Sequence, residues 1–358
     1  MPRPPRPRSA LLTALVGSAL LLAGAGCTSA GDAAGAAPSG SSAPTSASAP
    51  TVTRTSGTPT SGTPTSAAPS TSAGAGATTS PSPGSTSSAP ARAELPGGGR
   101  TLFPTYRLVG YAGRTGSTAL GRLGIGDADE RVSELERRAK PYAADGRKVM
   151  PVLEVIATTV QAGPGRDGQY RARMKDSEIE RYLDVARKHD ALLLLAIQPG
   201  RSDFLTEVKA YDRWLAEPDV GVALDPEWAM GPGQVPGHVF GHTTGAELDE
   251  VAAHLSSVTG KHDLPEKVMV FHELAAHIVT QENKLHQHRG VVLIKSVDGI
   301  GSPAAKRNTY RVVNEDSPEG VLPGFKLFYV EDRQTSSRLM TPEQVMALKP
   351  RPVYVMYE

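Results

Sequence analysis

Eight short apolar segments recur along the later part of the chain and constrain its fold more than any other feature. Each is rich in Val, Ile, Leu, Phe or Tyr and has the length of a buried strand. The segments therefore predict eight β-strands. They span residues 106–111, 148–155, 192–197, 220–224, 267–271, 291–296, 325–330 and 352–357.

The segments between these strands carry helix signals. Most open with Asp, Ser or Thr, which cap helices, and continue with apolar residues at helical spacing. The predicted helices span residues 127–143, 175–190, 202–217, 244–260 and 341–349, whereas residues 302–313 make a poor helix pattern. Apolar strands that alternate with helices are typical of a parallel sheet covered by helices.

We predict that residues 96–358 form a (β/α)8 barrel, the TIM-barrel fold, in the α/β class. Eight strand units in about 260 residues have the count and length of this fold. An open doubly wound sheet is the alternative, because glycines follow the first strand and Glu154 ends the second. These glycines have the spacing G-x-x-G-x-x-G, however, and the acid lies too far downstream for a dinucleotide fold.

The first 26 residues have the pattern of an export signal. Three arginines precede the apolar residues 10–26, and Cys27, the only cysteine of the chain, follows them. This pattern resembles a bacterial lipoprotein signal. The resemblance implies that Cys27 becomes a lipidated N-terminus, anchored to the outer face of the cell membrane. Secretion without a lipid is the alternative.

Residues 27–95 are predicted to form a disordered tether between this signal and the barrel. They consist largely of Ser, Thr, Ala, Pro and Gly, and residues 28–95 hold only four charged side chains. Such a composition buries too little apolar surface to offset the chain entropy of folding. We therefore expect three parts: residues 1–26, 27–95 and 96–358.

Charge and motif content narrow the expected partners. A net charge of +1 argues against a nucleic-acid partner, and we expect membrane contact through the lipid alone. HELAAH at residues 272–277 resembles a zinc-protease helix, but its histidines are five residues apart and point in different directions on a helix. We therefore expect no metal and no cofactor, and we expect a monomer.

Polar and aromatic residues gather where the predicted strands end. Active sites of TIM barrels lie at the carboxyl-terminal ends of the strands, so these residues are candidates for one shared site. They are Tyr111, Arg114, Glu154, Gln198, Arg201, Asp225, Glu227, Trp228, His272, Glu273, Lys295, Asp298, Glu331, Asp332, Tyr357 and Glu358.

The segment LDPEW, residues 224–228, carries the strongest chemical signal. Pro226 cannot continue a central strand, so Asp225 and Glu227 are predicted to enter the mouth of the barrel. If the chain stays extended through Pro226, the two carboxyl groups share a face. Two acids this close raise the pKa of one of them, as a general acid requires near neutral pH.

An Asp-x-Glu at the end of the fourth strand resembles the motif of two TIM-barrel glycoside hydrolase families, the family 25 muramidases and the family 18 chitinases. The resemblance implies that Glu227 protonates the glycosidic oxygen and that Asp225 orients or stabilises an N-acetyl group. The sequence also resembles retaining barrel glycosidases that carry a nucleophile after the seventh strand. In that scheme Glu331 is the nucleophile.

These features predict a cell-envelope lipoprotein whose barrel acts as a glycoside hydrolase on an envelope or extracellular carbohydrate. Glu227 is the expected acid, with Asp225 or Glu331 as its partner. Aromatic rings and polar side chains are expected to bind the sugar. The expected binding residues are Tyr111, Trp228 and Tyr357 as rings, and Glu154, Gln198, His272, Asp298 and Asp332 as hydroxyl partners.

Two alternatives from the same residues stay open. A carbohydrate-binding or structural lipoprotein would keep the barrel without turnover. In the other, Lys295 on the sixth strand serves as a Schiff-base nucleophile, as in aldolases of this fold.

Overall fold

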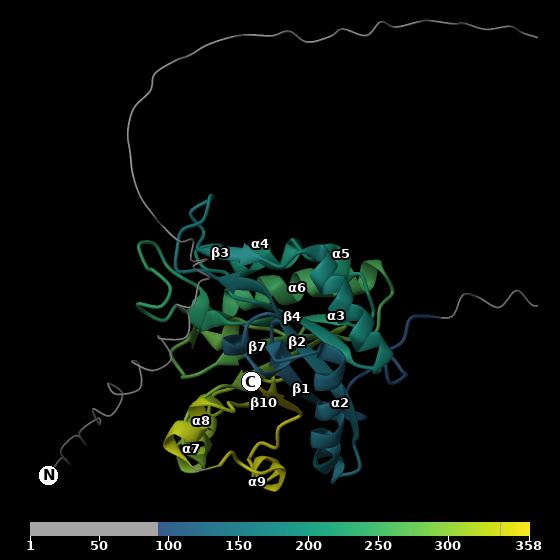
Figure 1. The fold of residues 1–358 in the computed structure, drawn as a ribbon. Coiled ribbons are helices and arrows are strands. Elements are labelled where there is room, and N and C mark those ends of the chain that lie inside the picture. Colours follow the sequence, from purple (N-terminus) through teal and green to yellow (C-terminus); the bar gives the residue numbers. More distant parts are fainter. Residues whose placement is uncertain (1–91, 337) are drawn as a thin grey trace, which may run out of the picture. The chain divides into compact units, whose positions relative to one another are not determined.

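The computed structural model describes residues 92–336 and 338–358 of the chain (Figure 1). Eight parallel strands form a closed ring, because β1 pairs with both β2 and β11. The predicted TIM barrel is therefore confirmed. Its strands are β1 (Tyr106–Gly113), β2 (Lys148–Val160), β4 (Leu192–Ile197), β5 (Val220–Leu224), β7 (Lys267–Glu273), β9 (Val291–Val297), β10 (Leu322–Leu327) and β11 (Tyr354–Tyr357).

The seventh barrel strand begins earlier than the sequence suggests. It was expected at residues 325–330, but β10 starts at Leu322 and contains Pro323 and Gly324. The sequence pattern excludes them because proline seldom enters a central strand. Pro323 is tolerated near the strand start, where its carbonyl accepts a hydrogen bond from the backbone N–H of Val353 at 2.8 Å.

Helices cover the outside of the barrel (Figure 1). They are α2 (Ala128–Ala139), α3 (Asp176–Lys188), α4 (Phe204–Lys209), α5 (Asp212–Leu215), α6 (Gly245–Lys261), α7 (Pro303–Val313), α8 (Glu331–Thr335) and α9 (Pro342–Met346). The segment with the poor helix pattern forms α7, because Ser302 caps the N–H of Ala305 and Pro303 occupies the first turn. The single helix expected at residues 202–217 is divided into α4 and α5.

Short strands and 3-10 helices lie in the loops between the barrel strands and the helices. The strand β3 (Arg171–Arg173) pairs antiparallel with the end of β2, and β6 (Thr243–Thr244) pairs with β8 (Val279–Thr280). The 3-10 helices are η2 (Thr118–Leu120), η3 (Arg122–Gly124), η4 (Lys140–Ala143), η5 (Pro226–Trp228) and η6 (Glu282–Lys284). Of these, η5 holds the candidate acid Glu227.

Apolar side chains form two separate layers. Side chains alternate along a strand, so Val152, Leu194 and Val270 fill the barrel interior. Their neighbours Leu153 and Leu195 pack outward against the helices. This alternation also decides which polar side chains reach the mouth of the barrel.

The amino-terminal end of the barrel is closed by the segment that precedes β1. Leu95 and Leu102 are buried and belong to the interior layer. The backbone N–H of Leu102 donates to Oε2 of Glu266 at 2.7 Å, next to the start of β7. The opposite, carboxyl-terminal end is therefore the mouth. The predicted signal, most of the predicted tether and Cys27 lie outside the described residues.

Candidate functional site

A cluster of polar side chains lies at the mouth, above the apolar interior; most are buried, whereas Glu227 and Glu358 are partly exposed. We call it the mouth cluster; its members are Glu154, Gln198, Asp225, Glu227, His272, Asp298, Lys326, Tyr354 and Glu358. Glu154 follows the inward Val152 by two residues, and His272 follows the inward Val270 in the same way. Strand alternation thus explains why these polar groups point to one place.

His272 lies at the centre of the cluster and is fully buried. Its Nδ1 is 2.8 Å from Oδ2 of Asp298. Its Nε2 is 3.3 Å from a carboxylate oxygen of Glu154 and 3.9 Å from Oδ1 of Asp225. Burial disfavours a charged ring, but Asp298 and Glu154 outweigh it and raise the pKa of His272 well above its usual value. His272 is therefore an imidazolium cation at neutral pH.

Lys326 supplies the second buried cation. Its Nζ is 2.6 Å from Oε2 of Glu358 and 3.3 Å from Oδ2 of Asp298. Burial lowers the pKa of Lys326, but Glu358 and Asp298 overcome this effect and raise it well above the ordinary value. Lys326 is not among the site residues expected from the sequence, because it lies within a predicted strand and not after its end. Its charge inside the otherwise apolar segment FKLFYV is the feature that could have indicated it.

Two acids of the cluster are held as carboxylates. Burial favours their neutral forms, but His272 and Lys326 lower the pKa of Asp298 to about 2. His272 is also the main cause that lowers the pKa of Glu154. Ser296 donates a hydrogen bond to Oδ1 of Asp298 at 2.8 Å, and the hydroxyl of Tyr354 donates to Glu154.

Asp225 and Glu227 differ from these two acids. Burial raises the pKa of Asp225 to about 6, although His272 and Lys326 act in the opposite direction. Burial and the nearby carboxylates of Asp225 and Asp298 raise the pKa of Glu227 well above its usual value. Glu227 therefore holds its proton more strongly than an ordinary glutamic acid, while Asp225 is largely ionised at neutral pH.

The local backbone brings these two acids together by a turn. The chain does not stay extended through Pro226; η5 begins there, and the N–H of Trp228 donates to the carbonyl of Asp225 at 3.0 Å. The expectation of a shared strand face is therefore wrong. Gln198 donates from Nε2 to Oδ2 of Asp225 at 3.1 Å, whereas Oε2 of Glu227 is buried and has no hydrogen-bond partner in the described part of the chain.

Other predicted residues lie outside the cluster. Tyr111 and Tyr357 face the outer layer because they follow the outward phase of their strands. The hydroxyl of Tyr111 donates to Oε1 of Glu134 at 2.9 Å, and that of Tyr357 is 2.6 Å from the hydroxyl of Tyr142. The structure therefore does not bring these two rings to the mouth.

The acids after the seventh strand occupy different environments. Asp332 is buried in the outer layer, where it accepts hydrogen bonds from the N–H groups of Gly301 and Phe328 at 3.0 Å. Its Oδ2 also lies 3.1 Å from Nζ of Lys306. Glu331 is partly exposed at the start of α8; burial and the charge of Glu358 raise its pKa. Glu331 is thus at the edge of the mouth cluster, and Asp332 is not part of it.

Lys295 also faces away from the mouth cluster. Its Nζ is 2.6 Å from Oε2 of Glu282 and 3.7 Å from Oε2 of Glu273, and it donates to the carbonyl of Val313 at 2.9 Å. These partners lie between the barrel and its outer elements. A substrate held at the mouth would not reach this amine, so the geometry does not favour the Schiff-base alternative.

The mouth cluster lies where TIM-barrel enzymes carry their active sites. Across residues 92–336 and 338–358, no group of three or more His, Cys, Asp or Glu side chains has the arrangement of a metal site. None of the helices in these same residues is long and apolar enough to span a membrane. No protein-family model and no curated protein matches this chain.

Proposed function

We propose that the barrel is a glycoside hydrolase that acts on an envelope or extracellular carbohydrate, with Glu227 as the general acid. One observation carries the proposal: the buried Oε2 of Glu227 has no hydrogen-bond partner in the described residues, and the pKa of this carboxyl is raised beside an ionisable Asp225. A buried polar atom without a partner is rare, and a substrate oxygen would satisfy it.

In this mechanism Glu227 transfers its proton to the glycosidic oxygen as the bond to the anomeric carbon breaks. The leaving sugar departs as an alcohol, and positive charge develops on the sugar that remains. Asp225 stabilises that charge or orients an N-acetyl group of the sugar, as the resemblance implies. A water molecule then bonds through its oxygen to the anomeric carbon and returns a proton to Glu227, so that the remaining sugar is released and the acid is regenerated. Glu331, at the edge of the mouth, is the alternative partner.

The electrostatics of the mouth cluster support this chemistry. Glu154 and Asp298 are ionised, and Glu358 forms an ion pair with Lys326. With Asp225 ionised as well, carboxylates outnumber the two buried cations. An excess of fixed negative charge favours an oxocarbenium-like transition state over the neutral ground state.

The burial of Asp225 and His272 counts against contact between the reacting acids and a sugar, so the second candidate is a carbohydrate-binding protein that holds its ligand outside these residues without turnover. Asp225 is 6% exposed and His272 is 0% exposed, so a sugar has little direct access to them in this conformation. Digestion of purified envelope fractions by the full chain, with mass spectrometry of released sugars, separates the candidates. Release that Glu227→Gln abolishes supports the hydrolase; sugar binding without any release supports the binding protein.

We also propose that Cys27 is lipidated and anchors the protein to the outer face of the cell membrane. Cys27→Ser is expected to shift the protein from the membrane fraction to the medium, because a lipid chain is the proposed anchor. Immunoblots of both fractions measure the shift. A mutant that stays with the membrane would contradict the anchor and would leave another contact to be found.

A further inference from the structure

A groove of about 770 Å³ lies beside the loops that carry the mouth cluster. Its size is within the range of small-molecule binding sites. Four segments line it: residues 167–171, 201–206, 229–232 and 242–250. Two of them follow β4 and β5 directly, as Gln198 and Glu227 do, so the groove and the candidate site share their loops.

One wall of the groove continues from the candidate acid. Ala229 and Met230 line the groove, and the partly exposed Trp228 connects them to Glu227. The N–H of Met230 donates to the carbonyl of Gly200 at 2.7 Å, and the N–H of Gly241 donates to the carbonyl of Glu227 at 2.7 Å. These bonds hold the wall in one position relative to Glu227.

Glycine is needed where this wall meets the next loop. A Cβ on Gly241 would clash with the backbone of Ala229. A side chain on Gly200, whose φ of +62° already favours glycine, would clash with the carbonyl of Gln169. The close backbone approach that shapes the groove therefore depends on both glycines.

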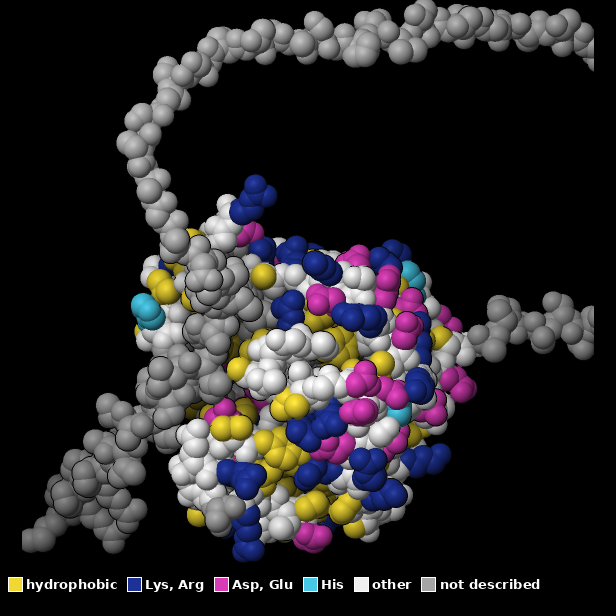
Figure 2. Space-filling model, in the orientation of Figure 1, with side chains coloured by type: hydrophobic (Ala, Val, Ile, Leu, Met, Phe, Trp, Pro, Cys, Tyr) yellow, Lys and Arg dark blue, Asp and Glu magenta, His cyan; other side chains and the backbone are white. Residues whose placement is uncertain are grey.

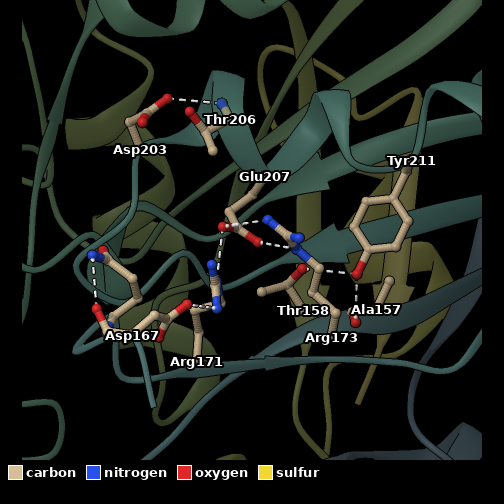
Figure 3. A network of polar contacts seen from close by, with 10 residues as sticks. Ala157, Thr158, Asp167, Arg171, Arg173, Asp203, Thr206, Glu207 and Tyr211 are labelled. Atoms are coloured by element: carbon tan, nitrogen blue, oxygen red, sulfur yellow. Dashed lines mark hydrogen bonds and ion pairs between the residues drawn. The ribbon is translucent and has the colours of Figure 1, made fainter. Parts of the chain in front are cut away.

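The opposite wall is built on an ion-pair network around one buried carboxylate, that of Glu207, and Figure 3 shows this network. Glu207 is fully buried and accepts hydrogen bonds from Nε of Arg171 and Nε of Arg173, each at 2.8 Å. Arg171 also donates to Asp167 at 2.7 Å. A wall fixed in this way loses little conformational entropy when a ligand binds.

The lining suits a neutral, hydroxyl-rich ligand. The charges of Asp167 and Arg171 are paired with each other, and Asp203 accepts the N–H of Thr206 at 2.7 Å. Around α4 and α6, basic and acidic side chains are interspersed on the surface (Figure 2). Arg201 lies over the ring of Tyr170, with its guanidinium carbon 4.3 Å from the ring centre. Acidic side chains outnumber basic ones in the lining, with Asp167, Asp203, Glu247 and Glu250 against Arg171 and Arg201. An anionic ligand is therefore disfavoured, whereas sugar hydroxyl groups find carboxylate acceptors.

We propose that this groove binds neutral sugar units that extend from the bond held at Glu227, so that the substrate is a glycan chain of several units. The inference rests on the proposed hydrolase function and names its substrate class. Short sugars fill only the mouth, whereas longer chains contact both the mouth and the groove. Affinity is therefore expected to rise with chain length.

Calorimetry on the full chain carrying Glu227→Gln tests this without cleavage of the probe. The probes are β-1,4-linked dimers and hexamers of N-acetylglucosamine and of glucose. At least one hexamer is expected to bind about tenfold more tightly than its dimer, a gain of about 1.4 kcal/mol. If no hexamer exceeds its dimer, the groove proposal is overturned.

Two groove variants and one matched control test whether the gain in affinity with chain length comes from the groove. Glu250→Trp places a bulky ring in the groove from α6, and Arg201→Ala removes the guanidinium from Tyr170. Both are expected to abolish the gain from chain length, whereas Glu315→Trp at an exposed position keeps it. Circular dichroism checks that each variant folds. A gain that survives in both folded groove variants contradicts the proposal.

The same data separate this inference from the function on which it rests. If affinity rises with chain length but the wild-type protein releases no sugar, the groove proposal is supported and the hydrolase proposal is contradicted. If sugar release depends on Glu227 but affinity does not rise with chain length, the hydrolase proposal is supported and the groove proposal is contradicted.

Discussion

Two acids, Glu207 beside the groove and Glu227 at the mouth, have opposite surroundings. Both carboxyl groups are removed from water, which favours the neutral form. Glu207 receives guanidinium hydrogen bonds on both oxygens, and Arg173 and Arg171 lower its pKa. Glu227 has carboxylates as its neighbours and keeps one oxygen without a partner.

The difference indicates what each acid does. A carboxylate whose hydrogen bonds are all made inside the protein has nothing left for a ligand, and its role is to hold β3 to α4. A carboxyl group that retains its proton and has an unpartnered oxygen can donate that proton to a substrate oxygen. For Glu207 and Glu227, the hydrogen bonds already made therefore distinguish the structural acid from the catalytic candidate better than burial does.

The largest expected effect is on turnover in Glu227→Gln. The amide keeps the shape of the side chain but has no transferable proton, so turnover is expected to fall by about 10²–10⁴-fold while sugar binding survives. Initial rates on the glycan that the envelope digestion identifies, beside a thermal melt, measure this. Full activity in a well-folded variant would remove Glu227 from the mechanism.

Glu207→Gln should reverse this pattern. Replacing the buried carboxylate weakens its charged hydrogen bonds to the partly exposed Arg171 and the exposed Arg173, which is expected to cost about 1–3 kcal/mol of unfolding free energy. Urea denaturation measures the loss, and the exposed Glu315→Gln is its control. If Glu207→Gln abolished turnover with unchanged stability, the contrast between the two acids would fail.

The activity is expected to follow the ionisation of Asp225. Its pKa of about 6 predicts that kcat/KM falls about tenfold per pH unit below pH 6, because the protonated acid no longer stabilises positive charge. The raised pKa of Glu227 moves the loss of the acid to a higher pH than for an ordinary glutamic acid. Asp225→Asn is expected to remove the acidic limb of the profile; an acidic limb that persists unchanged in this variant would assign it to another group.

The last expected effect concerns the pH dependence of stability through Glu273, a buried acid of the outer layer. Burial and Glu282 raise its pKa from 4.5 to about 8, although Lys295 acts against this shift. The folded state therefore keeps a proton that the unfolded chain has lost between these values. Unfolding free energy should fall as pH rises through this window, by at most about 1.4 kcal/mol per pH unit.

Glu273→Gln is the test, since its neutral amide cannot titrate. Denaturation from pH 5 to pH 9 is expected to show a flatter stability profile in the variant than in the wild type. Equal slopes in the two proteins would mean that the proton is lost at the same pH in the folded and unfolded states.

The sequence predicted the barrel and much of the mouth cluster because both depend on local patterns. Apolar strands and the polar residues that follow them are visible in the chain, and this located Glu154, Gln198, His272 and Asp298. Proline after Asp225 marked the end of β5 correctly. These features need no knowledge of distant contacts.

The features that the sequence did not predict depend on which side chains of each strand point into the barrel and which point outward; we call this the phase of the strand. Tyr111 and Tyr357 stand at strand ends, as the predicted site residues do, but one step out of phase with the interior. Lys326 and Tyr354 have the inward phase but lie inside apolar segments, where they look like core residues. Phase is set by packing against the helices, which the sequence of one strand does not contain.

The closure of the barrel by the segment before β1 also decides from which side a large ligand can approach. Because Leu95 and Leu102 pack at the end opposite the mouth, the chain enters the fold on the far side from Glu227 and its groove. A large ligand that approaches the mouth therefore meets the end of the barrel opposite to Leu95 and Leu102.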